Sequence, residues 1–230
     1  MARKWRPQRL VVLRIGEIME KINPEIREYI ETVILPKYNE LGGHTDEHIH
    51  YVIDRSLRFQ EQAPELNINM VYVIAAYHDL GRLVDNETHN FESAKMMRAD
   101  KFLAEHFSSD EVETMAQAVE DHRASLGREP RSKYGKLVSS ADRDTDYETM
   151  LSRVYDYTKH INPDKTEEEI LEEARKHLRE KYAVGGYAVK TMYFDDPVFN
   201  STMQKVEEAT ADLPTFAKIM QEHNTKRFTK

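Results

Sequence analysis

Apolar residues recur along most of this chain at the spacing of a helix rather than at the alternation of a strand. One such face consists of Ile49, Val52, Ile53 and Leu57. Another, in the C-terminal third, consists of Ile170, Ala174 and Leu178. Residues 68–80 are apolar on nearly every side, which is typical of a helix buried all round. The pattern therefore predicts an all-α protein with residues 68–80 at its centre.

Local signals mark where several of these helices begin and end. Helix starts are predicted at Asn23-Pro24, at Thr45, and at the capping boxes Ser108/Glu111 and Thr166/Glu169. Gly81 is expected to end the central helix, and Gly185 with Gly186 a later one. A further helix is expected over residues 91–105. The chain has only 8 glycines and 8 prolines, so few residues interrupt these helices.

The length of 230 residues suits one sizeable core with an extension. We expect residues 1–41 to form an N-terminal helical segment, residues 42–147 the core, and residues 148–230 a set of C-terminal helices. These last helices are expected to pack on the core, with the alternative that the helix over residues 170–182 binds a partner. The expected fold is a single helical bundle with a C-terminal helical extension.

Charge and composition exclude several classes of function. A formal net charge of −8 argues against bulk binding to nucleic acid or to an anionic membrane. The basic residues 1–9 precede only four apolar residues, too few for a signal peptide core, and no apolar run is long enough to cross a membrane. A cytoplasmic location is therefore expected. Because the chain has no cysteine, any metal must be bound by nitrogen and oxygen atoms.

The dipeptide His78-Asp79 lies at the end of the apolar segment 68–80. A buried histidine and a buried carboxylate are costly unless each has a partner, and one metal ion would partner both. Neighbouring residues on a helix point about 100° apart, so a shared ion is easiest near the helix end, which Gly81 is expected to provide. The alternative is a buried pair in which His78 and Asp79 satisfy each other.

Two further side chains complete the candidate metal site. His48 offers a second imidazole from an earlier helix, and Asp142 offers a second carboxylate from a later one. His44 or His50 is an alternative to His48, because all three lie close together in the sequence. Imidazole and carboxylate suit Mn, Fe, Zn, Ni or Mg, and the sequence does not choose among these divalent metals.

Five segments carry the chemistry in a fixed order. They are GHTDEHIHYV with His48, VIAAYHDLGR with His78-Asp79, HNFESAKMM with His89, VEDHRAS with His122, and LVSSADR with Asp142. In this order they resemble the HD superfamily of metal-dependent phosphohydrolases. The resemblance covers residues 42–147, and residues 120–143 look most like an uncharacterised prokaryotic branch. It implies an HD-type helical bundle with a metal cofactor.

The resemblance also implies roles for individual residues. The implied metal ligands are His48, His78, Asp79 and Asp142, and Asp79 is implied to be catalytic as well. His89 and His122 align with positions that bind a second metal in some HD proteins and contact substrate in others. Both are therefore implied to be catalytic, and the site is expected to hold either one ion or two. Plain surface histidines are the alternative for this second pair.

A basic segment follows His122 in an otherwise acidic chain. Residues 123–136 contain the five cations Arg123, Arg128, Arg131, Lys133 and Lys136 against the one carboxylate Glu129, a local charge of +4. Guanidinium groups match phosphate oxygens with two parallel hydrogen bonds, so a compact phosphate would suit this segment. The expected substrate-binding residues are Arg82, Arg123, Arg131, Lys136 and Arg143. The alternative is an ordinary solvated loop.

We therefore expect a metal-dependent phosphohydrolase that acts on a small phosphorylated substrate, a phosphomonoester or a nucleotide, through a metal-activated water. One alternative is a di-iron oxygenase, which some HD proteins with extra histidines are. Another is a metal-bearing or nucleotide-binding sensor without catalytic activity. The sequence names neither the substrate nor the metal, and it is compatible with a homo-oligomer.

Overall fold

The computed structural model describes residues 15–41 and 45–228, apart from the side chains of residues 45, 46 and 228. Over this part of the chain the backbone forms helices and turns and no strand, which confirms the all-α fold class. The chain divides into two compact units, Met1–Asp142 and Arg143–Lys230.

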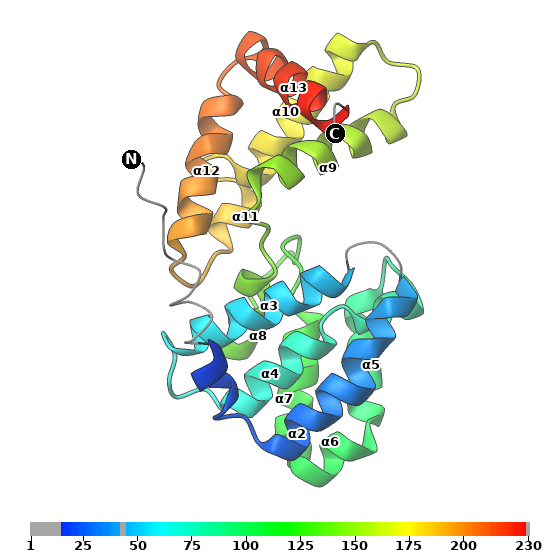
Figure 1. Cartoon of the computed structure of the whole chain (residues 1–230), viewed down its shortest axis with the longest axis vertical. Helices are drawn as coiled ribbons and strands as arrows, with labels where there is room; N and C mark the ends of the chain where they lie inside the picture. The colour runs from blue at the N-terminus through cyan, green and yellow to red at the C-terminus, as the bar shows by residue number, and fades with distance from the viewer. Residues whose placement is uncertain (1–14, 42–44, 229–230) are drawn as a thin grey trace, which may run out of the picture. The chain divides into compact units, whose positions relative to one another are not determined.

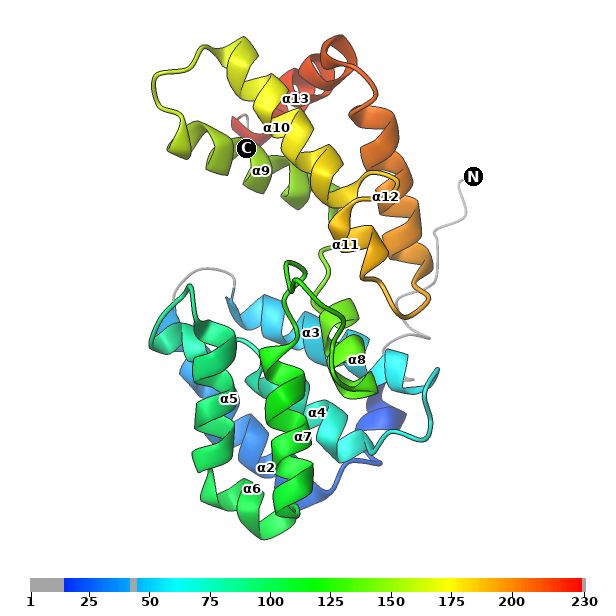
Figure 2. The ribbon, with the colours of Figure 1, turned by 180° about the vertical axis from the view of Figure 1, so that it is seen from behind.

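The N-terminal unit surrounds one apolar helix. Its elements are α2 (Pro24–Tyr29), the π-helix η1 (Ile30–Ile34), the 3-10 helix η2 (Leu35–Leu41), α3 (Thr45–Gln60), α4 (Ile68–Tyr77), the 3-10 helix η3 (Leu80–Leu83), α5 (His89–Ala99), α6 (Lys101–His106), α7 (Ser109–Glu120) and α8 (Lys133–Ala141). Helix α4 contacts α3, α5, α7 and α8 (Figure 1). Seen from behind, α7 runs beside α5 (Figure 2).

The burial of α4 follows from its sequence. Every residue from 70 to 77 is at most 4% exposed, and Asn67 caps the start of the helix by accepting the N–H of Asn69. On α3, the apolar face predicted from residues 49–57 is buried against this core. A helix that is apolar on all sides is stable only when other elements cover it, and here four helices do so.

Two predicted helix limits are wrong. Helix α4 ends at Tyr77 with His78 as its C-cap, and Gly81 lies inside η3 rather than after the helix. The helix expected over residues 91–105 is two helices, because Asp100 interrupts it and caps α6 with its carboxylate. The same carboxylate accepts hydrogen bonds from the hydroxyls of Tyr29 and Tyr77. The capping box of Ser108 and Glu111 is confirmed.

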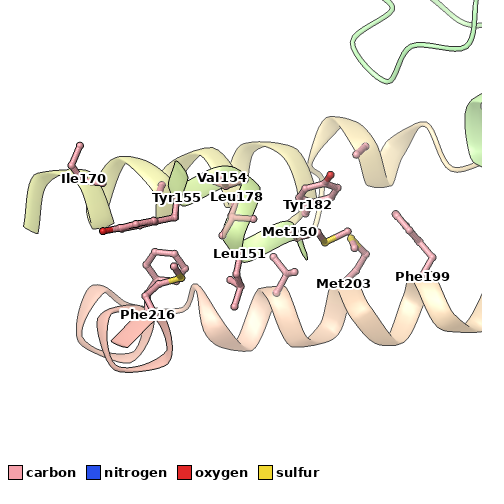
Figure 3. Packing of buried hydrophobic residues seen from close by; sticks show 14 residues of the cluster. Met150, Leu151, Val154, Tyr155, Ile170, Leu178, Tyr182, Phe199, Met203 and Phe216 are labelled. Carbon is pink, nitrogen blue, oxygen red and sulfur yellow. The ribbon is translucent and has the colours of Figure 1, made fainter. Parts of the chain in front are cut away.

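The C-terminal unit has its own apolar core. Its helices are α9 (Tyr147–Ile161), α10 (Glu167–Tyr182), α11 (Tyr187–Lys190), α12 (Pro197–Ala209) and α13 (Leu213–Phe228). Figure 3 shows side chains such as Leu151, Leu178 and Phe216 meeting between the helices of this unit. The capping box of Thr166 and Glu169 is confirmed. Gly185 has a φ of 82°, a conformation that favours glycine, just beyond the end of α10.

Some expectations concern parts of the chain or arrangements that the structure does not describe. The break at Gly42 and Gly43, the side-chain cap at Thr45, the basic residues 1–9 and His44 all lie outside the described residues and side chains. The packing of the C-terminal helices on the core stays a prediction. In the described part of the chain, no helix has both the length and the apolar character needed to cross a membrane.

Candidate metal centre

The C-terminal end of α4 brings His78 and Asp79 to the same side of the chain. His78 keeps a helical backbone conformation, whereas Asp79 leaves the helix with φ −107° and ψ 2°. This change of direction removes the divergence that two neighbouring side chains have within a helix. Both side chains are buried, with exposures of 0% for His78 and 5% for Asp79. The dipeptide thus lies at a helix end, as the sequence predicts, although Gly81 does not form that end.

Three imidazole rings are oriented in the same way by the main chain. In His78, His89 and His122 the Nδ1 atom lies 2.7–2.8 Å from the carbonyl oxygen three residues earlier. A carbonyl oxygen only accepts, so Nδ1 carries the proton in each neutral ring. The Nε2 atom is then left with a free lone pair, which is the state in which a histidine binds a metal.

The ligand atoms gather in two groups with one carboxylate between them. His48, His78 and Asp142 form the first group, and Asp79, His89 and His122 form the second. In the first, Oδ1 of Asp142 lies 3.1 Å from Nε2 of His48 and 3.8 Å from Nε2 of His78. The structure therefore brings together all six residues that the sequence analysis selects as metal ligands.

Asp79 faces both groups. Its Oδ1 lies 3.2 Å from Nε2 of His89 and 3.7 Å from Nε2 of His122. Its Oδ2 lies 3.7 Å from Nε2 of His48 and 3.7 Å from Nε2 of His78. One oxygen is thus directed to each group, so Asp79 could offer a ligand atom to an ion in either group.

The donor set fits divalent metal ions. Two bonds of about 2.1 Å to one ion place their ligand atoms roughly 3.0 Å apart at a right angle and up to roughly 4.2 Å apart in line. Nε2 of His78 is buried and has no hydrogen-bond partner. Nε2 of His89 lies 3.2 Å from Nε2 of His122, although neither needs to carry a proton. Lone pairs that converge without protons between them are costly unless a cation lies among them.

The carboxylates of the centre are held in the charged form. Burial by itself raises the pKa of Asp142, but the hydrogen bond with His48 and the nearby histidines bring it well below the usual value. For Asp79, burial and the nearby carboxylate of Asp142 raise the pKa, but the adjacent His78 and the cation of Arg82 oppose them, so that the net shift is downward. Two ionised carboxylates supply the negative charge that a divalent ion requires.

The histidines of the second group are held in the neutral form. Burial and, to a smaller extent, the nearby His78 lower the pKa of His122 to about 4, against the opposing effect of the carboxylates. Burial also lowers the pKa of His89, and the charges of Arg82 and Arg123 act in the same direction. Neutral imidazole is the form that binds a metal, so at neutral pH these rings need not lose a proton first.

A comparison with protein-family models gives one match that coincides with this centre. Residues 45–145 match the model of the HD domain. This chain carries an HD domain. The match includes all six candidate ligands of the centre. Comparisons with curated proteins and with solved structures gave no match.

Two of the five predicted substrate-binding residues lie at the edge of the HD-domain centre. Arg82 donates from Nε to Oδ2 of Asp79 at 2.7 Å and from Nη1 to Asn86 at 2.8 Å. Arg123 is exposed and donates from Nη1 to the carbonyl oxygen of Glu87 at 2.7 Å. Arg82 thus contacts the carboxylate that faces both groups, and Arg123 directly follows His122 in the sequence.

The other three predicted residues have other partners. Arg131 binds the carboxylate of Asp121 through Nε and Nη2, at 2.9 and 2.8 Å. Lys136 forms an ion pair of 2.7 Å with Glu129. Arg143 begins the C-terminal unit, where its Nη2 donates to the hydroxyl of Thr191 at 2.9 Å. Their role in substrate binding stays a prediction.

Asp121 is a residue that the sequence analysis does not select. Its side chain is 1% exposed and pairs with both Arg128 and Arg131. It thereby fixes the loop between α7 and α8, which also carries Arg123. The charge count that makes this loop basic starts at residue 123 and so omits Asp121 and Glu120, which directly precede it. Extending that window by three residues would have found the partners of these arginines.

His50, the alternative to His48, does not join the described ligand groups. It lines a separate surface pocket together with Asp54 and Tyr72. His48 lies two residues earlier on α3, and at 3.1 Å its Nε2 is within hydrogen-bond distance of Asp142. Residues two apart on a helix point to nearly opposite sides, so both histidines cannot face one centre.

Proposed function

We propose that this HD-domain protein is a metal-dependent phosphohydrolase that acts on a small phosphorylated substrate, a phosphomonoester or a nucleotide. The observation that carries the proposal is the pair of ligand groups joined by Asp79, with two arginines at their edge. His48, His78 and Asp142 would hold one divalent ion, and His89 with His122 would hold a second. Bound there, divalent ions supply a Lewis acid and a water of lowered pKa.

The side chains around the centre have separate tasks in this proposal. Arg82 and Arg123 bind phosphate oxygens, on which negative charge increases in the transition state. Asp79 directs one carboxylate oxygen to each ligand group. Arg82 donates to Asp79 and also binds the phosphate of the substrate. The main-chain carbonyl groups that accept from the histidine Nδ1 atoms keep the rings fixed, so little reorganisation is needed during the reaction.

The first experiment measures metal content and hydrolysis together. The full chain is freed of metal with a chelator and titrated separately with Mn²⁺, Fe²⁺, Zn²⁺, Ni²⁺ and Mg²⁺, and bound metal is counted by elemental analysis. Phosphate release is then measured against a panel of nucleotides and sugar phosphates. We expect stoichiometric binding of at least one metal and hydrolysis of at least one substrate class.

Two variants give this experiment its control. His78→Ala removes a fully buried ligand and should abolish both metal retention and hydrolysis. His177→Ala removes a histidine of the C-terminal unit and should change neither. Wild-type metal stoichiometry in His78→Ala would contradict the proposed centre. Iron-dependent consumption of oxygen without phosphate release would indicate a di-iron oxygenase, and tight nucleotide binding without turnover would indicate a sensor.

A further inference from the structure

Arg55 is a buried cation in the HD domain that belongs to neither ligand group. It lies on α3, is 6% exposed, and packs against the rings of Tyr51 and Phe59 at 5.2 and 5.3 Å. Its Nη1 donates to the carbonyl oxygen of Ala141 at 2.7 Å. Burial of a guanidinium group is costly, so we ask what the hydrogen bond from Arg55 contributes to the HD domain.

The contact with Ala141 fixes the peptide unit that leads into Asp142. Ala141 is the last residue of α8, so its carbonyl group has no partner within the helix. The N–H at the other end of this peptide unit, that of Asp142, donates to Val138 at 2.9 Å. Because a peptide unit is planar, holding it at both ends fixes the position of the Cα of Asp142, from which the ligand side chain extends.

Arg55 and His48 act on Asp142 from one helix. They are seven residues apart on α3, about two turns, and so lie on the same face. His48 approaches the carboxylate of Asp142, at 3.1 Å, while Arg55 holds the main chain just before it. A cation at a helix C-terminus also interacts favourably with the helix dipole of α8. One face of α3 thus supplies a ligand and the support for another ligand.

Tyr38 has the corresponding position at the end of α4. Its side chain is 1% exposed, and its hydroxyl donates to the carbonyl oxygen of Ala76 at 2.9 Å. The neighbouring carbonyl group, that of Ala75, accepts from Nδ1 of His78.

We propose that Arg55 and Tyr38 are positioning residues of the metal centre, which hold the last carbonyl groups of α8 and α4 and thereby place Asp142 and His78-Asp79. This inference rests on the proposed metal site. Tyr38 lies in η2, before the residues that match the HD domain, so the segment preceding that domain takes part in forming the centre.

The test measures metal affinity in the chelator-treated full chain, by calorimetric titration with Mn²⁺ and with Zn²⁺. Tyr38→Phe removes only the hydroxyl, whereas Arg55→Met keeps an unbranched side chain but removes the charge and all guanidinium donors. Each should weaken metal affinity about 10–100-fold, the range for residues that orient metal ligands. Arg55→Lys retains one donor and should restore part of the lost affinity.

Two controls separate positioning from a general loss of stability. Arg58→Met changes an arginine on the same helix whose side chain is 45% exposed, and it should leave affinity unchanged. Val112→Ala removes buried apolar contacts at the start of α7 and is the control for loss of stability alone. Urea unfolding of the metal-free proteins gives the free energy of unfolding of every variant. Affinity within twofold of wild type in Arg55→Met overturns the role of Arg55, and the same result in Tyr38→Phe overturns that of Tyr38.

The outcomes also distinguish this inference from the function on which it rests. If the Arg55 and Tyr38 variants lose no more metal affinity than a control variant with the same free energy of unfolding, both residues are merely structural and the inference is overturned. If the wild-type chain binds another of the five metals instead, the titration uses that metal. A wild-type chain that binds none of the five overturns the inference and the proposed function together. Wild-type binding with unchanged variants overturns the inference alone. The measurement needs no substrate and no catalytic activity.

Discussion

At the scale of single residues, the position of Asp79 bears on whether the centre would hold one ion or two. Each of its oxygens faces a different group, and each group contains two histidines. A single ion would use His48, His78, Asp79 and Asp142, whereas the approach of His89 to His122 within 3.2 Å adds a second pair of nitrogen atoms beside Asp79. The geometry therefore favours the two-ion alternative.

We expect His89→Ala and His122→Ala each to lower the metal count from two to one. Each change removes one of the three ligands of the second group and leaves the first group intact. Elemental analysis at saturating metal measures the count. One ion in the wild-type chain under the same conditions would show that the second group binds substrate or solvent instead.

The arginines of the loop between α7 and α8 should differ in effect. Arg123→Ala removes an exposed cation beside the second group, so kcat/KM for the phosphorylated substrate should fall about a hundredfold with unchanged metal content. Arg131→Ala leaves the buried Asp121 with fewer partners and should lower the free energy of unfolding by about 1–3 kcal/mol.

Steady-state kinetics and urea unfolding of both variants check this contrast. If both variants lost activity equally and neither lost stability, Arg131 would bind substrate rather than only Asp121. Activity within twofold of wild type in Arg123→Ala would remove that residue from the substrate site.

At the scale of elements, η3 and α5 pack so closely that only glycine fits at position 81. A Cβ there would lie 2.1 Å from the carbonyl oxygen of His89 and 2.5 Å from the N–H nitrogen of Ser93. The N–H of Gly81 also donates to the Ser93 hydroxyl at 2.7 Å. Since α5 begins at His89, this contact sets the position of a candidate ligand.

Gly81→Ala should therefore destabilise the protein and disturb the second group. Crowding against main-chain atoms typically costs about 1–3 kcal/mol, and the shift of α5 should weaken binding of the second ion. Urea unfolding and elemental analysis measure the two effects. Gly127→Ala is the matched control, because nothing lies within 4 Å of the added carbon. A Gly81→Ala protein as stable as Gly127→Ala would contradict this account of the contact.

At this scale, a serine, a histidine and a glutamate in the C-terminal unit resemble a catalytic triad but lack an oxyanion-stabilising N–H at the serine. The hydroxyl of Ser152 lies 2.8 Å from Nε2 of His223, whose Nδ1 lies 2.5 Å from Glu148. Ser152 is inside α9, where its main-chain N–H is used by the helix and cannot stabilise an oxyanion. The three residues instead join α9 to α13.

The limits of the sequence analysis also show at this scale. The capping boxes at Ser108 and Thr166 were predictable because they depend on two residues in the same helical turn. The break at Asp100 was not, because its carboxylate binds Tyr29 and Tyr77, which are distant in the sequence. For the same reason the partner of Arg55 could not be predicted.

At the scale of the whole molecule, the candidate ligands were found from the sequence because they stand in motifs of a known order. The five matching segments bring His48 and Asp142 together across 94 residues, which no local pattern could do. The support of the centre was not found, since Tyr38 stands outside those segments and Arg55 carries no motif. The substrate also stays open, because loops rather than motifs shape its pocket.

The division into two units predicts that the stability of the C-terminal unit can be lowered without loss of metal binding. All six candidate ligands belong to the unit that ends at Asp142, whereas the C-terminal unit has a core of its own. Phe216 lies in that core and is 0% exposed. Phe216→Ala should lower the stability of the C-terminal unit by about 3–5 kcal/mol, because it leaves a cavity among packed apolar side chains.

The metal count of Phe216→Ala should nevertheless equal that of wild type. Thermal unfolding followed by circular dichroism, with elemental analysis below the transition, measures both quantities. Val198→Ala changes a side chain of the same unit that is 61% exposed and should alter neither. If Phe216→Ala lost metal in proportion to its loss of stability, the centre would depend on the C-terminal core. The two units would then unfold as one cooperative structure.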